Sequence, residues 1–297
     1  MDELTPHALR RRDALARGYT DSEIRTLCRN GGLDRLRPGA YLRGGVELDP
    51  RQRHVELIRA TLPGVSVDAV VSHQSAAVLH GLPMWGIPLD RVHVTRDRTG
   101  GGRRTRHLHS HSAPLPDRNV LVRNGIPLTS LARTVADLCR TSSFETAVVI
   151  GDAALRVSAV QPDEIRDAST YAIGPPGYPA ALRALEFLNG RSESVGESRS
   201  RVALAALGLP APDLQASLLD ADGLLLGRVD FLFADTGVVG EFDGKVKYGK
   251  YLRDGQAPGD AVLTEKQRED RIRDAGWGRM RARERPTRRE SPRHRMR

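Results

Sequence analysis

Apolar positions follow a helical period in the first part of this chain and a strand period near its end. Residues 7–18, "HALRRRDALARG", carry alanines and leucines at helical spacing and stop at a glycine, which predicts a short helix. A second helix is predicted to begin at the capping box "TDSE", where the Thr20 hydroxyl accepts from the amide of Glu23, and to end at Gly31-Gly32. Residues 33–43, "LDRLRPGAYLR", then place a Pro-Gly turn between two short extended pieces.

This order of elements predicts a DNA-binding role for the front of the chain. Two helices joined by a tight turn and followed by a basic hairpin have the layout of a winged helix-turn-helix, which we assign to residues 1–45. The predicted DNA contacts are four arginines of the second helix and the hairpin: Arg25, Arg29, Arg35 and Arg37. A plain helical hairpin used only for packing is the alternative interpretation.

The following segment, residues 46–170, mixes helical and strand patterns, so the expected fold class is α+β. Helices are expected over residues 51–63, 71–83 and 128–140, and strands over residues 91–96 and 105–113. A glycine-rich loop, "RDRTGGGRRTR" at residues 96–106, carries five arginines and joins the two strands. This loop is a second place where the chain can meet nucleic acid.

Histidines in this middle segment fall into two groups. His73 and His80 are seven residues apart on one helical face, and His107, His109 and His111 alternate along one strand. Either group could bind a metal ion. Helix packing is the favoured interpretation for the first group, and a solvated or phosphate-facing strip for the second.

Glycine and proline cluster at residues 171–180, which we interpret as a linker to a last unit at residues 181–277. In that unit a helix is expected over residues 197–207, followed by three antiparallel strands. The strands are separated by turns at "DADG" and "ADTG", and a second, charged helix is expected over residues 261–276.

Three carboxylates and a lysine interrupt the apolar alternation of these strands. Glu241, Asp243 and Lys245 point to one side of their strand, and Asp230 lies on the neighbouring strand. Carboxylates at such short separations repel one another unless a cation lies among them, and oxygen ligands suit Mg²⁺ or Mn²⁺. The predicted metal ligands are therefore Asp230, Glu241 and Asp243, and the predicted chemistry is phosphodiester hydrolysis, with Lys245 stabilising charge or orienting the water.

Each of these residues also has a purely structural interpretation. Glu197, on the preceding helix, could close a capping box with Ser194 or pair with Arg201. The Asp243-Gly244 pair could be a turn that ends the strand, and Lys245 could be a solvated lysine at the sheet edge.

The motifs "SVGESRSR", "GLPAP", "GRVDF", "EFDGKVKYG" and "EKQRED" resemble the PD-(D/E)xK nuclease superfamily, nearest to very-short-patch-repair endonucleases. The resemblance covers residues 192–277 and implies a small sheet flanked by helices. It also implies that Glu197 matches a helix carboxylate that joins the metal site of that superfamily. The acid-x-lysine motif has two registers here: Glu241 to Asp243, or Asp243 to Lys245.

The front of the chain resembles a different family. The stretches "VSHQSAAVLHGLP", "RVHVT" and "GIPLTSLARTVADLC", together with residues 4–42, are similar to AbiEi-family antitoxins of type IV toxin–antitoxin systems. The likeness covers residues 4–155. It implies a winged helix that binds operator DNA, a middle domain with antitoxic activity, and a nucleotidyltransferase-like toxin as a genetic partner without direct contact.

Charge is distributed unevenly. The net charge is +9, yet residues 278–297 hold nine arginines and two glutamates and so carry most of it. This segment lacks apolar alternation, so we expect a disordered basic tail where related nuclease-like domains continue with a strand. A genuine tail and a shifted reading frame both explain it.

Two distant cysteines, the absence of an 18-residue apolar run and an N-terminus without a signal-peptide core predict a reduced, cytoplasmic protein with no membrane partner. We expect a DNA-binding, antitoxin-like transcriptional regulator carrying a Mg²⁺-dependent endonuclease-like domain. The alternatives are a pure repressor or antitoxin with a vestigial nuclease domain, and a repair-type endonuclease targeted by its front domains.

Overall fold

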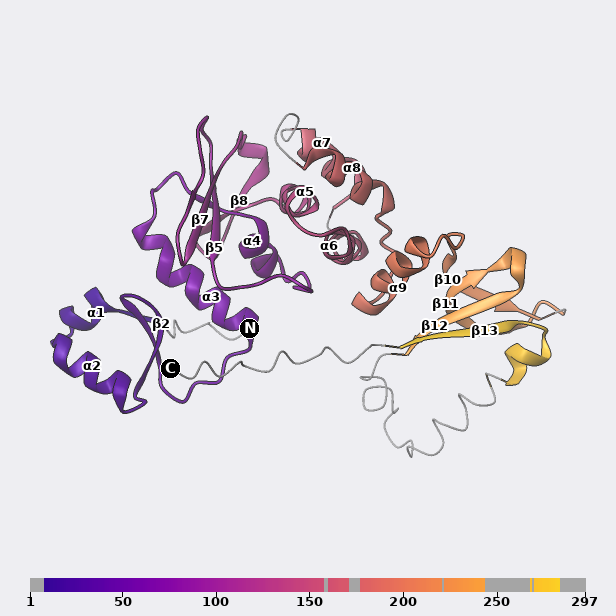
Figure 1. The fold of residues 1–297 in the computed structure, drawn as a ribbon, viewed down its shortest axis with the longest axis horizontal. Coiled ribbons are helices and arrows are strands. Elements are labelled where there is room, and N and C mark those ends of the chain that lie inside the picture. The colour runs from indigo at the N-terminus through magenta and orange to yellow at the C-terminus, as the bar shows by residue number, and fades with distance from the viewer. Residues whose placement is uncertain are drawn as a thin grey trace, which may run out of the picture. The chain divides into compact units, whose positions relative to one another are not determined.

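The computed structural model describes residues 8–157, 160–170, 177–220, 222–243, 268 and 270–283. Its class is α+β, as predicted, with three sheets and helices around them (Figure 1). The chain divides into two compact units between Gly190 and Arg191, and each unit is described here by itself.

The first unit begins with a three-stranded sheet in the order β1-β3-β2 and two short helices. The elements are β1 (Ala8–Arg10), α1 (Arg11–Ala16), α2 (Asp21–Arg29), β2 (Leu33–Arg37) and β3 (Ala40–Arg43). The predicted capping box is confirmed, because Thr20 accepts from the amide of Glu23 at 3.2 Å and its own amide donates to the Glu23 carboxylate at 2.7 Å. The first helix is shorter than predicted, since residues 8–10 pair with β3 instead.

A six-stranded mixed sheet follows, in the order β6-β7-β5-β4-β9-β8. Its strands are β4 (Val70–Val71), β5 (Val92–Arg96), β6 (Arg103–Arg104), β7 (Leu108–Ser112), β8 (Val120–Arg123) and β9 (Ile126–Thr129). Helices α3 (Pro50–Thr61) and α4 (His73–His80) pack against the central strands. Apolar side chains of β2 and β3 join the core between these helices and the sheet, so residues 1–45 do not form a separate compact unit.

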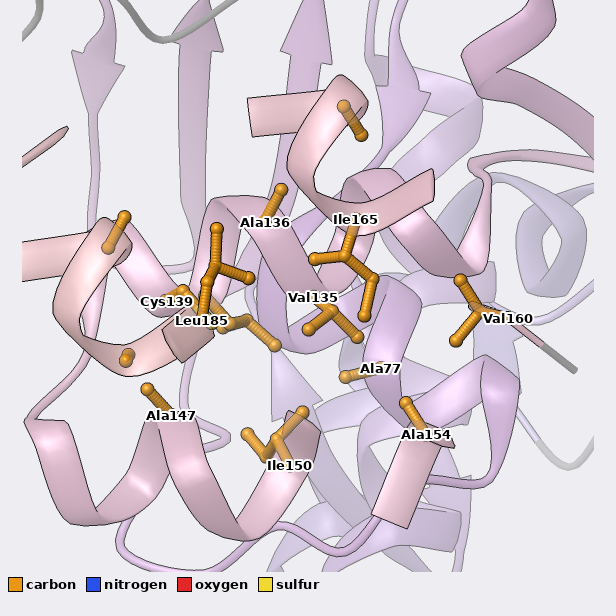
Figure 2. Packing of buried hydrophobic residues seen from close by; sticks show 14 of the residues in the cluster. Ala77, Val135, Ala136, Cys139, Ala147, Ile150, Ala154, Val160, Ile165 and Leu185 are labelled. Carbon is orange, nitrogen blue, oxygen red and sulfur yellow. The ribbon is translucent and has the colours of Figure 1, made fainter. Parts of the chain in front are cut away.

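Helices α5 to α8 form a second core beyond α4, which Figure 2 shows from close by. Their bounds are Leu131–Thr141, Phe144–Arg156, Pro162–Ser169 and Tyr178–Phe187. Ala181, Ala184 and Leu185 of α8 are buried in this core with Val135 and Ile150. Because α8 buries its apolar face there, it belongs to the first unit. Our placement of residues 181–190 in the last domain was wrong.

The second unit is a four-stranded sheet with α9 (Val195–Ala206) packed on it. The predicted three antiparallel strands are confirmed as β10 (Asp213–Leu219), β11 (Leu225–Phe233) and β12 (Val238–Asp243). Residues 270–274 are helical, in the place expected for the charged helix. The core of this unit includes Val229, Val239 and Ile272.

A fourth strand, β13 (Gly278–Arg283), pairs in parallel with β12 over its whole length. We predicted disorder from residue 278 onward and a missing final strand, and this was wrong for residues 278–283. A strand at a sheet edge is held by backbone hydrogen bonds to one neighbour and therefore needs little apolar alternation. Residues 284–297 of the predicted tail lie outside the described residues.

Gly196 sets how closely α9 approaches the sheet. A β-carbon at this position would lie 2.0 Å from the Phe242 ring on β12. We therefore expect Gly196→Ala to destabilise the second unit by roughly 1–3 kcal/mol, through overpacking. Urea unfolding in a Trp85→Phe background, where Trp277 is the sole tryptophan, measures this.

The control is the double variant Gly196→Ala with Phe242→Leu, in which the smaller side chain makes room for the added methyl group. We expect it to recover part of the lost stability. A Gly196→Ala variant as stable as the wild type contradicts this account of the packing.

Candidate functional site

The first candidate surface lies on α2 and the β2–β3 hairpin. Arg25 and Arg29 are exposed one turn apart on α2, and Arg35 is exposed on β2. These three of the four predicted contacts present guanidinium groups at the protein surface, with Arg29 also donating to the Thr26 hydroxyl at 3.1 Å. Ile24, on the buried face of α2, packs with Ala14 in a small core and so anchors the helix.

Arg37 does not belong to this surface. Its Nη2 donates to the carbonyl of Ala60 near the end of α3, and its Nη1 donates to the carbonyl of Pro38 at 3.1 Å. Partial burial lowers the pKa of Arg37 from its usual value. In the structure the Arg37 side chain thus ties the hairpin to α3, and its assignment as a phosphate contact stays a prediction.

The glycine-rich loop offers a further basic surface. The four exposed arginines in it are Arg98, Arg103, Arg104 and Arg106. Arg96, at its start, pairs instead with Asp68 at 2.8 Å, which lowers the pKa of that carboxyl to about 2.

The second candidate site lies where α9 meets the sheet of the second unit. Glu197 is only 6% exposed. Its carboxylate accepts from the Ser194 hydroxyl and from the amide of Glu193, each at 2.8 Å. The Ser194 hydroxyl also accepts from the amide of Glu197 at 3.2 Å and so caps α9, but the reciprocal bond of a capping box comes from the Glu193 amide and not from that of Ser194. The same carboxylate also accepts from the side-chain amide of Gln215 at 2.8 Å.

Gln215 joins Glu197 to Asp230. Its amide nitrogen also donates to Asp230 Oδ1 at 3.4 Å, while Asp230 Oδ2 accepts from the backbone amide of Phe242 at 2.8 Å. Burial, and to a smaller extent the nearby Asp230 charge, raise the pKa of Glu197. The two acids thus lie near one another around one shared amide donor.

Sequence reasoning missed Gln215. Its φ is +53°, a left-handed conformation that costs a non-glycine residue roughly 1–3 kcal/mol. Leu214 pairs with Phe231 and Ala216 with Val229, which places Gln215 opposite Asp230. In β10, polar Asp213, Gln215 and Ser217 alternate with apolar residues, so the sequence alone does not mark Gln215 as a site residue.

The other predicted acids have different surroundings. Glu241 Oε1 accepts from Arg268 Nη2 at 2.6 Å, and the same guanidinium nitrogen donates to the carbonyl of Arg228 at 2.7 Å. Asp243 is partly buried at the end of β12, and Lys245 lies outside the described residues. Among the described residues, Asp230, Glu241 and Asp243 do not form a group of three ligands that could hold one ion.

The set of ligand atoms that the described residues do gather within 4.8 Å is formed by His73, His93 and His111. His111 and His109 extend from β7, His93 from β5, and His73 begins α4. Burial is the main cause that lowers the pKa of His93 to about 2 and of His111 to about 3, so these rings are neutral at pH 7. The expected solvated strip on β7 is therefore wrong for His111, which is stacked on His73 with ring centroids 3.7 Å apart.

The remaining histidines have separate roles. His80, predicted to share a face with His73, contacts the carbonyl of Thr129 at 2.8 Å, in keeping with the favoured packing role. His107 is half-buried and lies between the glycine-rich loop and the start of β7.

No family model matches the sequence. Uncharacterized proteins MT2308 and Rv2248, from two strains of Mycobacterium tuberculosis, are each 30% identical to this chain over 149 residues, which is 50% of this chain and 52% of theirs. The chain thus spans about half the length of the curated relatives it matches.

A solved structure, that of the RV2827C protein from Mycobacterium tuberculosis, aligns with 72% of this chain and 84% of its own, at a TM-score of 0.41 and 14% identity. In the part of the chain that the structure describes, no helix has the length and apolarity to cross a membrane.

Proposed function

We propose that this protein is a DNA-binding transcriptional regulator of the AbiEi-antitoxin type, with a winged helix-turn-helix at its front. The observation that carries the proposal is the row of exposed arginines on α2 and β2: Arg25, Arg29 and Arg35. They lie on a helix and a hairpin that are both anchored to the same small core, so their positions are fixed before DNA arrives. A nucleotidyltransferase-like toxin remains the proposed genetic partner.

Phosphate contacts explain what such a surface does. Guanidinium groups bind phosphate oxygens and release condensed counterions, which makes binding strong at low salt and weak at high salt. A helix of this kind then reads base edges in the major groove. The test is titration of a mixed-sequence DNA duplex with the full chain at several salt concentrations. Binding that is absent at low salt refutes the proposal.

A second candidate function, phosphodiester hydrolysis in the second unit, is favoured by the Glu197–Gln215–Asp230 arrangement. The side-chain amide of Gln215 donates to both acids, and the strained backbone of this residue is a feature typical of functional sites. Mg²⁺ or Mn²⁺ is the cofactor that the nuclease resemblance implies, and oxygen donors suit either ion.

The described residues fit such an ion only in part. Glu197 and Asp230 lie together around Gln215, but Glu241 is held by Arg268, and the predicted ligand set is not gathered. We therefore assign no hydrolytic step to an ion. The alternative is a nuclease-like unit without activity. It is favoured by the Arg268–Glu241 pair, because this pair occupies a carboxylate that the predicted ion would need.

Plasmid nicking with Mg²⁺ or Mn²⁺ separates these alternatives. Nicking that is lost in Asp230→Asn, while DNA binding is unchanged, supports hydrolysis. Absence of nicking in the wild type, with melting temperature unaffected by either ion, supports a binding module alone.

A further inference from the structure

We propose that His73, His93 and His111 form a binding site for one transition-metal ion of the zinc class. The site joins the start of α4 to the neighbouring strands β5 and β7 in the six-stranded sheet. It is separate from the DNA-facing arginines and lies in a different unit from the carboxylates of the second unit. Neither proposed function uses these histidines.

The spacing of the nitrogens carries the proposal. The three residues each offer one ligand atom, and these atoms lie within 4.8 Å of one another. His93 Nδ1 and His111 Nε2 are 3.0 Å apart. In a tetrahedral site with Zn–N distances of about 2.0–2.1 Å, ligand nitrogens are about 3.3 Å apart. On binding, the His93–His111 pair therefore separates slightly, and any of the three nitrogens that lie up to 4.8 Å apart move closer.

His73 supplies the second observation. Its ring is 2% exposed, and its Nε2 is buried without a hydrogen-bond partner among the described residues. A buried polar atom without a hydrogen-bond partner lowers the stability of the fold, and such atoms are rare in folded proteins. Its backbone is also strained, with a φ of +50° at the first position of α4. A bound ion gives that nitrogen the partner it lacks.

The outer nitrogen of His73 already has a partner. Ser72 Oγ contacts His73 Nδ1 at 2.9 Å, and Asp137 Oδ2 lies 4.0 Å from the same atom. Metal-binding histidines usually have such a partner on the second ring nitrogen, which fixes the tautomer and leaves the first nitrogen free to bind. At His93 the amide nitrogen of Gln74 donates to Nε2 at 2.7 Å, so the ring proton lies on Nδ1 and is donated to His111 Nε2. Binding of an ion at His93 Nδ1 therefore displaces this proton, and the Gln74 amide turns its oxygen toward Nε2.

The donor set selects the kind of ion. Three imidazole nitrogens favour Zn²⁺, Co²⁺, Ni²⁺ or Cu²⁺ over Mg²⁺ and Ca²⁺, which prefer oxygen. Three protein ligands leave a fourth position for water. Because the His73 and His111 rings are stacked, at least one of them turns on binding so that both nitrogens face the ion.

The experiment uses the full chain, stripped of metal with a chelator and then titrated with Zn²⁺ by calorimetry. We expect one Zn²⁺ ion per chain. Co²⁺ is the spectroscopic probe, and its visible absorption should have the intensity of a four-coordinate site and disappear when Zn²⁺ is added. His93→Gln and His111→Gln should each weaken Zn²⁺ binding by more than about 100-fold, since loss of an outer partner alone costs about 10- to 100-fold.

One variant is a matched control. His107→Gln changes a histidine that directly precedes β7 but lies outside the cluster, and it should bind Zn²⁺ like the wild type. Wild-type protein that binds no stoichiometric Zn²⁺, or that gives only the weak Co²⁺ absorption of an octahedral ion, overturns the proposal even if a histidine variant fails to fold. Equal loss in His107→Gln overturns it as well.

Discussion

Changing Arg25, Arg29 and Arg35 together to alanine is expected to reduce the slope of log K against log salt for duplex DNA by about 2.7, since each phosphate contact contributes about 0.9 to this slope through counterion release. The three side chains are exposed on α2 and β2, so their removal changes the charge of the surface without disturbing the core beneath it. Fluorescence anisotropy of a labelled mixed-sequence duplex, measured across a series of salt concentrations, gives both K and the slope.

A second triple variant serves as the matched control. Arg156, Arg166 and Arg183 are exposed on α6, α7 and α8, and changing them to alanine removes the same amount of charge. We expect this variant to keep nearly the wild-type slope. Equal losses in both triple variants show that binding follows net charge alone, and then the α2 surface is not the DNA interface.

An Arg37 variant separates loss of stability from loss of DNA contacts. Because its guanidinium bonds the Ala60 carbonyl, Arg37→Ala should lower the stability of the first unit while leaving the salt slope of the folded protein unchanged.

Asp137→Ala is expected to destabilise the first unit by about 3–5 kcal/mol, because removing one member of a buried ion pair leaves the other charge buried without compensation. The Asp137 carboxylate lies 3.1 Å from Arg133 Nε, and the two side chains are 5% and 3% exposed. Burial raises the pKa of Asp137, and the nearby guanidinium of Arg133 opposes this shift.

Urea unfolding in a Trp277→Phe background measures this effect, because Trp85 is then the sole tryptophan and lies in the first unit. The control is the double change Arg133→Met with Asp137→Leu, which removes both charges and keeps apolar volume. It should lose far less stability than Asp137→Ala, since exchange of a whole buried pair for apolar groups is often neutral. The same loss in both variants means that packing, and not the uncompensated charge, sets the cost.

The sequence by itself determined most of the local structure. The capping box at Thr20, the Pro-Gly turn before β3 and the alternation in β11 and β12 specify their elements through short-range hydrogen bonds and periodicity. These signals act within a few residues, so they can be read without knowing what packs against them. The exposed arginines of α2 and β2 followed from the same patterns.

Only the tertiary structure decided which side chains meet. Arg37 contacts a carbonyl 23 residues away, Gln215 joins acids from α9 and β11, and three histidines from α4, β5 and β7 converge. Strand β13 forms because β12 offers a free edge for backbone pairing, which its own arginine-rich sequence does not signal. Long-range contacts depend on how helices and strands pack on one another, and that packing is a property of the whole fold, whereas local patterns are a property of the segment.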